Sequence, residues 1–126
     1  MADNVQTAKS AYDAFSSGDM DTLKEMFAED AVWVSSDELP LGGTTEGRDQ
    51  IIANFEQLPS YWSEFSVEPE EFIGGDDAVT IRGTQRATGK GGSFECPYLH
   101  LMRFSDGKLV RGEFFTDSAK AKAALG

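Results

Sequence analysis

The change in hydrophobic period at Pro59 is the feature that most constrains the fold of this chain. Before Pro59, apolar residues recur at intervals of three to four residues, the period of a helix, and after it they alternate, the period of a strand. The chain therefore places helices first and a series of strands after them. That order predicts an α+β domain, in which one curved antiparallel sheet has helices packed against one face.

Three helices are expected in the first half of the chain. The first ends at Gly18, a residue type that commonly stops a helix, and Asp19 can cap the second. A short strand of β-branched and aromatic residues, 31–34, follows the second helix. The third helix is expected over residues 44–59, because its apolar residues share one face and Pro59 ends it.

Four strands are expected in the second half. They span residues 65–73, 78–88, 93–104 and 108–116, and Gly- and Asp-rich turns separate them. Pro69 indicates a bulge or an edge in the first of them. A brief C-terminal helix can follow, capped by Asp117 or Ser118. No repeat, linker or composition shift marks a second domain, so residues 1–126 are expected to form one.

The charge balance limits the partners that this chain can have. Acidic residues outnumber basic ones by 22 to 11, and the formal net charge is −11. The basic residues form no stripe that could follow a phosphate backbone, so we expect neither nucleic acid nor an anionic membrane as a partner. The single cysteine cannot form an internal disulfide, and the N-terminal residues lack a signal-peptide pattern. We therefore expect a cytoplasmic protein.

No metal or cofactor site is expected. One histidine and one cysteine cannot build an ordinary zinc site, and no acidic cluster has calcium-loop spacing. The glycine-rich stretch 89–92 joins two strands and opens no helix, so it is neither a phosphate loop nor a dinucleotide-binding turn. Any chemistry must then come from ordinary side chains.

Three segments resemble a known superfamily. They are "AYDAFSSGDMDTLKEMFAEDAVW" at the start, "TEGRDQIIANF" in the third helix and "HLMRFSDGKLVRGEFFTDSA" in the closing hairpin. On these segments and on its order of elements, the chain resembles the nuclear-transport-factor-2-like superfamily, which includes ketosteroid isomerase and the SnoaL-type polyketide cyclases. The resemblance covers nearly the whole chain. It implies a single SnoaL-like domain, a cystatin-like α+β barrel whose sheet forms a cone around a helix-lined pocket.

The positions that carry catalysis in ketosteroid isomerase are all changed in this chain. The catalytic aspartate base falls at Ser35, and the oxyanion tyrosine falls at Ala11, although Tyr12 is adjacent. The protonated carboxylic acid of the oxyanion hole falls at His100. Steroid isomerisation by that mechanism is therefore not expected, and the fold alone does not specify another reaction.

His100 is the first candidate for a catalytic residue. Alternation places it on the same strand face as Tyr98 and Met102, and the resemblance makes that face the concave one. In a dry pocket an imidazole suits acid–base or electrophilic work. The alternative is a core histidine that is hydrogen-bonded to Tyr98, Gln85 or a backbone carbonyl. Either way we expect a buried, neutral ring, because desolvation disfavours its charged form.

Asp117 is the second candidate, because SnoaL-type proteins tend to carry an acidic residue where the last strand ends. The alternative for Asp117 is a helix N-cap. Tyr12 is expected to assist His100. The substrate is expected to bind against a lining of aromatic and polar residues, of which two or three aromatic ones belong to the core: Phe15, Trp33, Phe55, Trp62, Gln85, Tyr98, Met102 and Phe114.

Two functions remain open from the sequence. The first is a cofactor-independent enzyme acting on a small apolar molecule that bears a carbonyl or hydroxyl group, of isomerase, cyclase, dehydratase or hydrolase type. The second is a non-catalytic module that uses the same pocket to bind a small ligand, or that serves for dimerisation. In both cases the convex sheet face, with Arg111, Glu113 and Phe115, is expected to form a homodimer.

Overall fold

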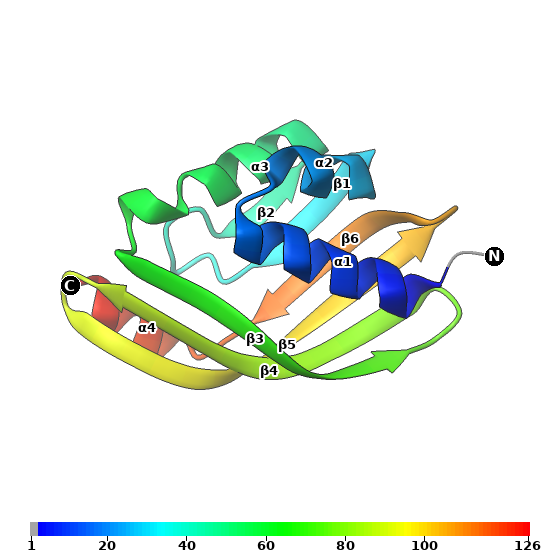
Figure 1. The fold of residues 1–126 in the computed structure, drawn as a ribbon. Helices are drawn as coiled ribbons and strands as arrows, with labels where there is room; N and C mark the ends of the chain where they lie inside the picture. The colour runs from blue at the N-terminus through cyan, green and yellow to red at the C-terminus, as the bar shows by residue number, and fades with distance from the viewer. Residues whose placement is uncertain (1–2) are drawn as a thin grey trace.

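The computed structural model describes residues 3–126 of the chain (Figure 1). Its elements follow in the order α1 (Asn4–Ser17), α2 (Met20–Met26), β1 (Phe27–Ser35), β2 (Gly43–Glu46), α3 (Arg48–Glu56), the 3-10 turn η1 (Leu58–Ser60), β3 (Glu64–Gly74), β4 (Ala78–Gly89), β5 (Gly92–Ser105), β6 (Lys108–Phe115) and α4 (Ser118–Leu125). Helices thus precede the long strands, and the α+β class is confirmed.

The strands form one six-stranded sheet in the order β2-β1-β6-β5-β4-β3. The strands from β3 to β6 make an antiparallel meander, and β1 joins it by pairing parallel to β6. The sheet curves without closing, because β2 and β3 remain its two edges. Figure 1 shows α1, α2 and α3 on one side of this curved sheet, and α4 beside the turn between β4 and β5.

Residues at the helix ends act as the sequence predicts. The Asp19 carboxylate accepts a hydrogen bond from the Thr22 N–H and caps α2. Gly18 takes the left-handed conformation, with φ of 76°, and closes α1. The face that α1 buries consists of small residues, Ala8, Ala11 and Ala14. This helix can therefore lie close to the sheet and bring its larger side chains, such as Tyr12, into the concave side.

The segment expected to begin the third helix is a strand instead. Residues 43–46 form β2, in which Thr44 and Thr45 pair with Val34 and Trp33 of β1. Helix α3 begins only at Arg48, after Gly47 has turned the chain with φ of 92°. The strand forms because β-branched threonines suit a pleated ladder. A strand of four residues is too short for its alternation to stand out in the sequence.

The expected bulge in β3 is present. The register with β4 shifts between Pro69 and Glu71, on an edge strand where a missing N–H is tolerated. The extra residue reverses which side chains face the helices. Phe72 therefore packs against the core, whereas Ile73 is 56% exposed.

The homodimer stays a prediction, and we expect its interface on the convex face of the sheet. Leu99 and Phe115 are register partners on β5 and β6, and they are 48% and 56% exposed. Adjacent apolar side chains that are exposed to water mark an interaction surface, so we expect a symmetric dimer in which these two residues are buried. Light scattering should give twice the monomer mass for the natural chain and the monomer mass for L99E/F115E. K90E, in a turn away from this face, is the control. A monomer at micromolar concentration would contradict the prediction.

Candidate functional site

A cavity of about 150 Å³ lies between the concave face of the sheet and the helices α1 and α3. Its walls are largely apolar, and on them the Phe55 ring packs edge-on against both Phe15 and Trp33. None of the lining residues within the described range 3–126 is Asp, Glu, Lys or Arg. An apolar cavity of roughly this volume accommodates a molecule the size of a single six-membered ring.

His100 and Tyr12 meet at this cavity. The Tyr12 hydroxyl oxygen lies 3.0 Å from Nδ1 of His100, which joins α1 to β5 across the core. His100 is only 4% exposed, and its Nε2 atom is buried without a hydrogen-bond partner among residues 3–126. We assign Tyr12 as the donor to Nδ1, because a phenol O–H is more acidic than the N–H of a neutral imidazole; this assignment places the ring proton on Nε2.

Burial keeps both members of this pair neutral. It lowers the pKa of His100 from 6.5 to about 3, since a charged imidazole would lose its hydration. Burial also raises the pKa of Tyr12 far above its usual range, and the neighbouring Tyr98 adds to that rise. At neutral pH the site therefore presents a neutral N–H donor and an un-ionised phenol.

Aromatic rings hold the imidazole in place. The centroid of the His100 ring lies 4.8 Å from that of Trp33 and 5.6 Å from that of Phe114, both in edge-on arrangements. Gly112 on β6 makes this packing possible. A Cβ atom there would lie 2.5 Å from the Trp33 ring and 3.4 Å from Nε2 of His100, so any larger residue would displace the indole.

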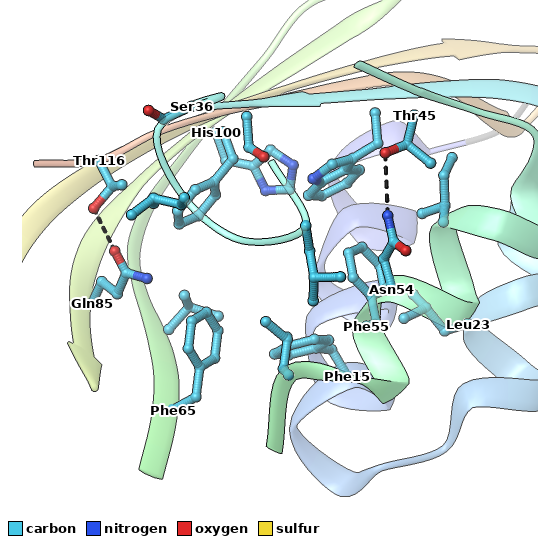
Figure 2. Close-up of a pocket in the computed structure, with 18 of the residues that line it drawn as sticks. Phe15, Leu23, Ser36, Thr45, Asn54, Phe55, Phe65, Gln85, His100 and Thr116 are labelled. Atoms are coloured by element: carbon cyan, nitrogen blue, oxygen red, sulfur yellow. Dashed lines mark hydrogen bonds between the residues drawn. The ribbon is translucent and has the colours of Figure 1, made fainter. Parts of the chain in front are cut away.

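A second polar group lies on another wall of the cavity. The Thr116 hydroxyl donates a hydrogen bond to Oε1 of Gln85, and the Cys96 Sγ lies 3.2 Å from the Thr116 oxygen. Figure 2 shows the Gln85–Thr116 pair on one side of the cavity, with His100 farther along the sheet. Gln85 is 4% exposed, so its amide is as dry as the imidazole.

Most of the sequence-predicted residues line the cavity. They are Tyr12, Phe15, Trp33, Phe55, Trp62, Gln85, His100, Met102 and Phe114. Tyr98 does not, because its ring stacks on Phe114 at 5.1 Å between centroids and belongs to the core. Asp117 does not either. It is exposed, and its carboxylate accepts the Lys120 N–H as the N-cap of α4, as the alternative interpretation had it.

Sequence reasoning missed the loop between β1 and β2. Leu39, Pro40 and Leu41 of this loop line the cavity, and Leu41 has a left-handed backbone with φ of 66°. It also missed Asn54, which donates to the Thr45 hydroxyl at the cavity wall. No periodicity identifies a loop residue as a pocket residue. Asn54, by contrast, could have been found because it lies three residues after Ile51 and therefore on the same face of α3.

Two kinds of feature are absent from the part of the chain that the structure describes. No group of three or more His, Cys, Asp or Glu side chains within residues 3–126 is arranged to hold a metal ion. Across the same range, no helix combines the length and apolar character that crossing a bilayer requires.

The buried neutral imidazole should make stability depend on pH. Between pH 6.5 and 3 the unfolded chain protonates His100 whereas the folded chain does not, so stability falls as the pH drops below about 6.5. Denaturant titrations between about pH 6.5 and 5, above the range of ordinary carboxylates, should show a loss approaching ~1.4 kcal/mol per pH unit. Since the chain has one histidine, H100F should flatten this slope. An unchanged slope in H100F would contradict the assignment.

Comparisons with known proteins agree with this geometry. The family model described as the SnoaL-like domain matches residues 8–112. No curated protein matches the chain. An NTF2-like protein of unknown function from Burkholderia pseudomallei is 31% identical, with 99% of this chain and 98% of that chain covered and a TM-score of 0.91.

Two further solved structures are similar to this chain. TerC, co-crystallized with polyporic acid, is 25% identical, with 97% of each chain covered and a TM-score of 0.88. A putative SnoaL-like polyketide cyclase from Jannaschia sp. is 19% identical, with 97% of this chain and 90% of that chain covered and a TM-score of 0.83, and it shares the fold.

Proposed function

Since this chain belongs to the SnoaL-like domain family, we propose that its cavity binds a small, largely apolar molecule through a carbonyl or hydroxyl oxygen and promotes an isomerisation or cyclisation of it without a cofactor. TerC, which was co-crystallized with polyporic acid, and the similarity to a putative SnoaL-like polyketide cyclase support a small-molecule role. The observation that carries the proposal is the Nε2 atom of His100, which is buried without a hydrogen-bond partner among residues 3–126 on a side chain that lines the cavity.

In this proposal His100 acts as an electrophile. With a pKa of about 3 its neutral ring is a very weak base, so abstraction of a substrate proton is not its role. Its Nε2–H can instead donate to a substrate carbonyl and to the enolate that develops from it. Such a fixed donor is most effective in a dry site, where charge that develops on oxygen has little other stabilisation.

Tyr12 is the positioning residue for this donor. Its hydroxyl, 3.0 Å from Nδ1, holds the proton of the neutral ring on Nε2 and fixes the plane of the imidazole. The lining residues between positions 3 and 126 include no carboxylate that could serve as base. The C–H proton then passes to a water molecule, and because water is a weak base the reaction suits a substrate whose C–H bond is already acidic, such as one between two carbonyl groups.

A second candidate function is binding without catalysis. The absence of any charged side chain among the described lining residues favours it, since proton transfer usually relies on one. The same His100 donor would then contribute to affinity only.

Ligand binding tests the role of His100. The probe is cyclohexanone, and methylenecyclohexane is its control, because it has a similar shape and no oxygen. Removing one hydrogen-bond donor should lower cyclohexanone affinity about fivefold to tenfold in H100F and leave the affinity for the control unchanged. Protein-observed NMR titration measures both. Equal cyclohexanone affinity in H100F and the natural chain would overturn the proposal.

Turnover separates the two candidate functions. The keto–enol conversion of 2-acetylcyclohexanone, followed by ultraviolet absorbance, should be faster with the natural chain than with H100F. The rate with Y12F should lie between those two rates, because Y12F keeps the His100 imidazole but removes the hydroxyl that holds its proton on Nε2. Binding of this diketone with no acceleration of the conversion would assign the cavity to binding alone.

A further inference from the structure

We propose that the cavity selects a single-ring molecule with acceptor oxygens at two opposite ends, one bound by His100 Nε2–H and the other by the side-chain amide of Gln85. This inference rests on the proposed function for its His100 end. Its second end rests on independent observations at Gln85. It identifies Gln85 as a specificity-determining residue and specifies the class of ligand.

The amide of Gln85 is oriented by a chain of hydrogen bonds. The Thr116 hydroxyl has one proton, and it donates that proton to Oε1 of Gln85. The Cys96 thiol, 3.2 Å from the Thr116 oxygen, can then donate to that oxygen. This order leaves the NH₂ group of Gln85 free. Figure 2 shows the amide nitrogen on the side away from Thr116, toward the open space of the cavity.

The His100 imidazole and the Gln85 amide therefore have the same hydrogen-bonding arrangement. In each, a neighbouring hydroxyl satisfies the acceptor atom of the group, Tyr12 for His100 and Thr116 for Gln85. Each group is 4% exposed, and each lines the cavity. A ligand that presents acceptors satisfies both donors, whereas a ligand that presents an ammonium group would set N–H against N–H.

The sheet register sets the distance between the two ends. Ile81 pairs with His100, and Gln85 lies four residues farther along β4 on the same face. At about 3.3 Å per residue this is a spacing of ~13 Å along the strands. Two N–H···O bonds of about 2.9 Å each leave roughly 7 Å between the acceptors, and somewhat less on a concave sheet. That is the scale of a six-membered ring with oxygens at positions 1 and 4.

The wall between the two donors suits such a ring. Phe114, the register partner of His100, lies on the way to Thr116 along β6 and presents an apolar surface to the cavity. The cavity volume of about 150 Å³ also limits the ligand to about one ring. No charged side chain among the described lining residues would compensate an ionic group, so the class is uncharged molecules with 1,4-related carbonyl or hydroxyl oxygens.

The test compares 1,4-cyclohexanedione with cyclohexanone, which differ by the second oxygen. NMR titrations would give the ratio of the two affinities for the natural chain, for Q85M and for T116V. Q85M keeps the side-chain length without its donor, so it should lower dione affinity about fivefold to tenfold and leave cyclohexanone affinity unchanged. T116V, which frees the amide to rotate, should shift the ratio in the same direction by less. Thermal melts establish that each variant is folded.

The outcomes separate this inference from the proposed function. The same affinity ratio in the natural chain, Q85M and T116V would overturn the Gln85 end, even if H100F still loses cyclohexanone affinity. Unchanged cyclohexanone affinity in H100F, with a ratio that depends on Gln85, would overturn the His100 end instead. Failure of both ketones to bind the natural chain at millimolar concentration would overturn the ligand class. Should Q85M not fold, T116V alone decides the Gln85 end.

Discussion

The hydrogen bond between Tyr12 and His100 is the interaction on which the rest of the site depends. It joins the first helix to a central strand across the core, and with Tyr12 assigned as the donor it places the proton of the imidazole on Nε2. The packing around this hydrogen bond also holds the imidazole in place. Small residues on α1 allow the helix to approach, and Gly112 leaves room for Trp33 against the ring. The result is a neutral donor in a dry cavity.

The second half of the fold was predictable from the sequence, because its strands are long enough for their alternation of apolar and polar residues to stand out. Alternation along β4 and β5, which are 12 and 14 residues long, identifies the concave face, and that face correctly includes Gln85 and His100. Local rules also located the caps Gly18, Asp19 and Asp117. Residues 44–46 of β2 were mistaken for the start of a helix, because so short a strand has no period of its own and forms only through its pairing with β1.

The candidate site was predicted as a set of residues, without its connections. Alternation cannot separate a cavity-lining ring from a core ring on the same face, which is why Tyr98 was expected to bind substrate although it stacks behind Phe114. Nor could it reveal that Thr116 orients Gln85, since Gln85 lies on β4 and Thr116 directly follows β6, and β5 separates these two strands. Such contacts depend on sheet register and curvature, and a single sequence specifies neither directly.

The state of the His100 ring in the ligand-free protein tests the central claim most directly. Long-range ¹⁵N–¹H correlation spectra of the ring, recorded between about pH 5 and 8, report both its charge and its tautomer. The account predicts a neutral ring protonated on Nε2, with chemical shifts that stay constant over this range. A ring that titrates near its ordinary value, or one that holds its proton on Nδ1, would contradict it.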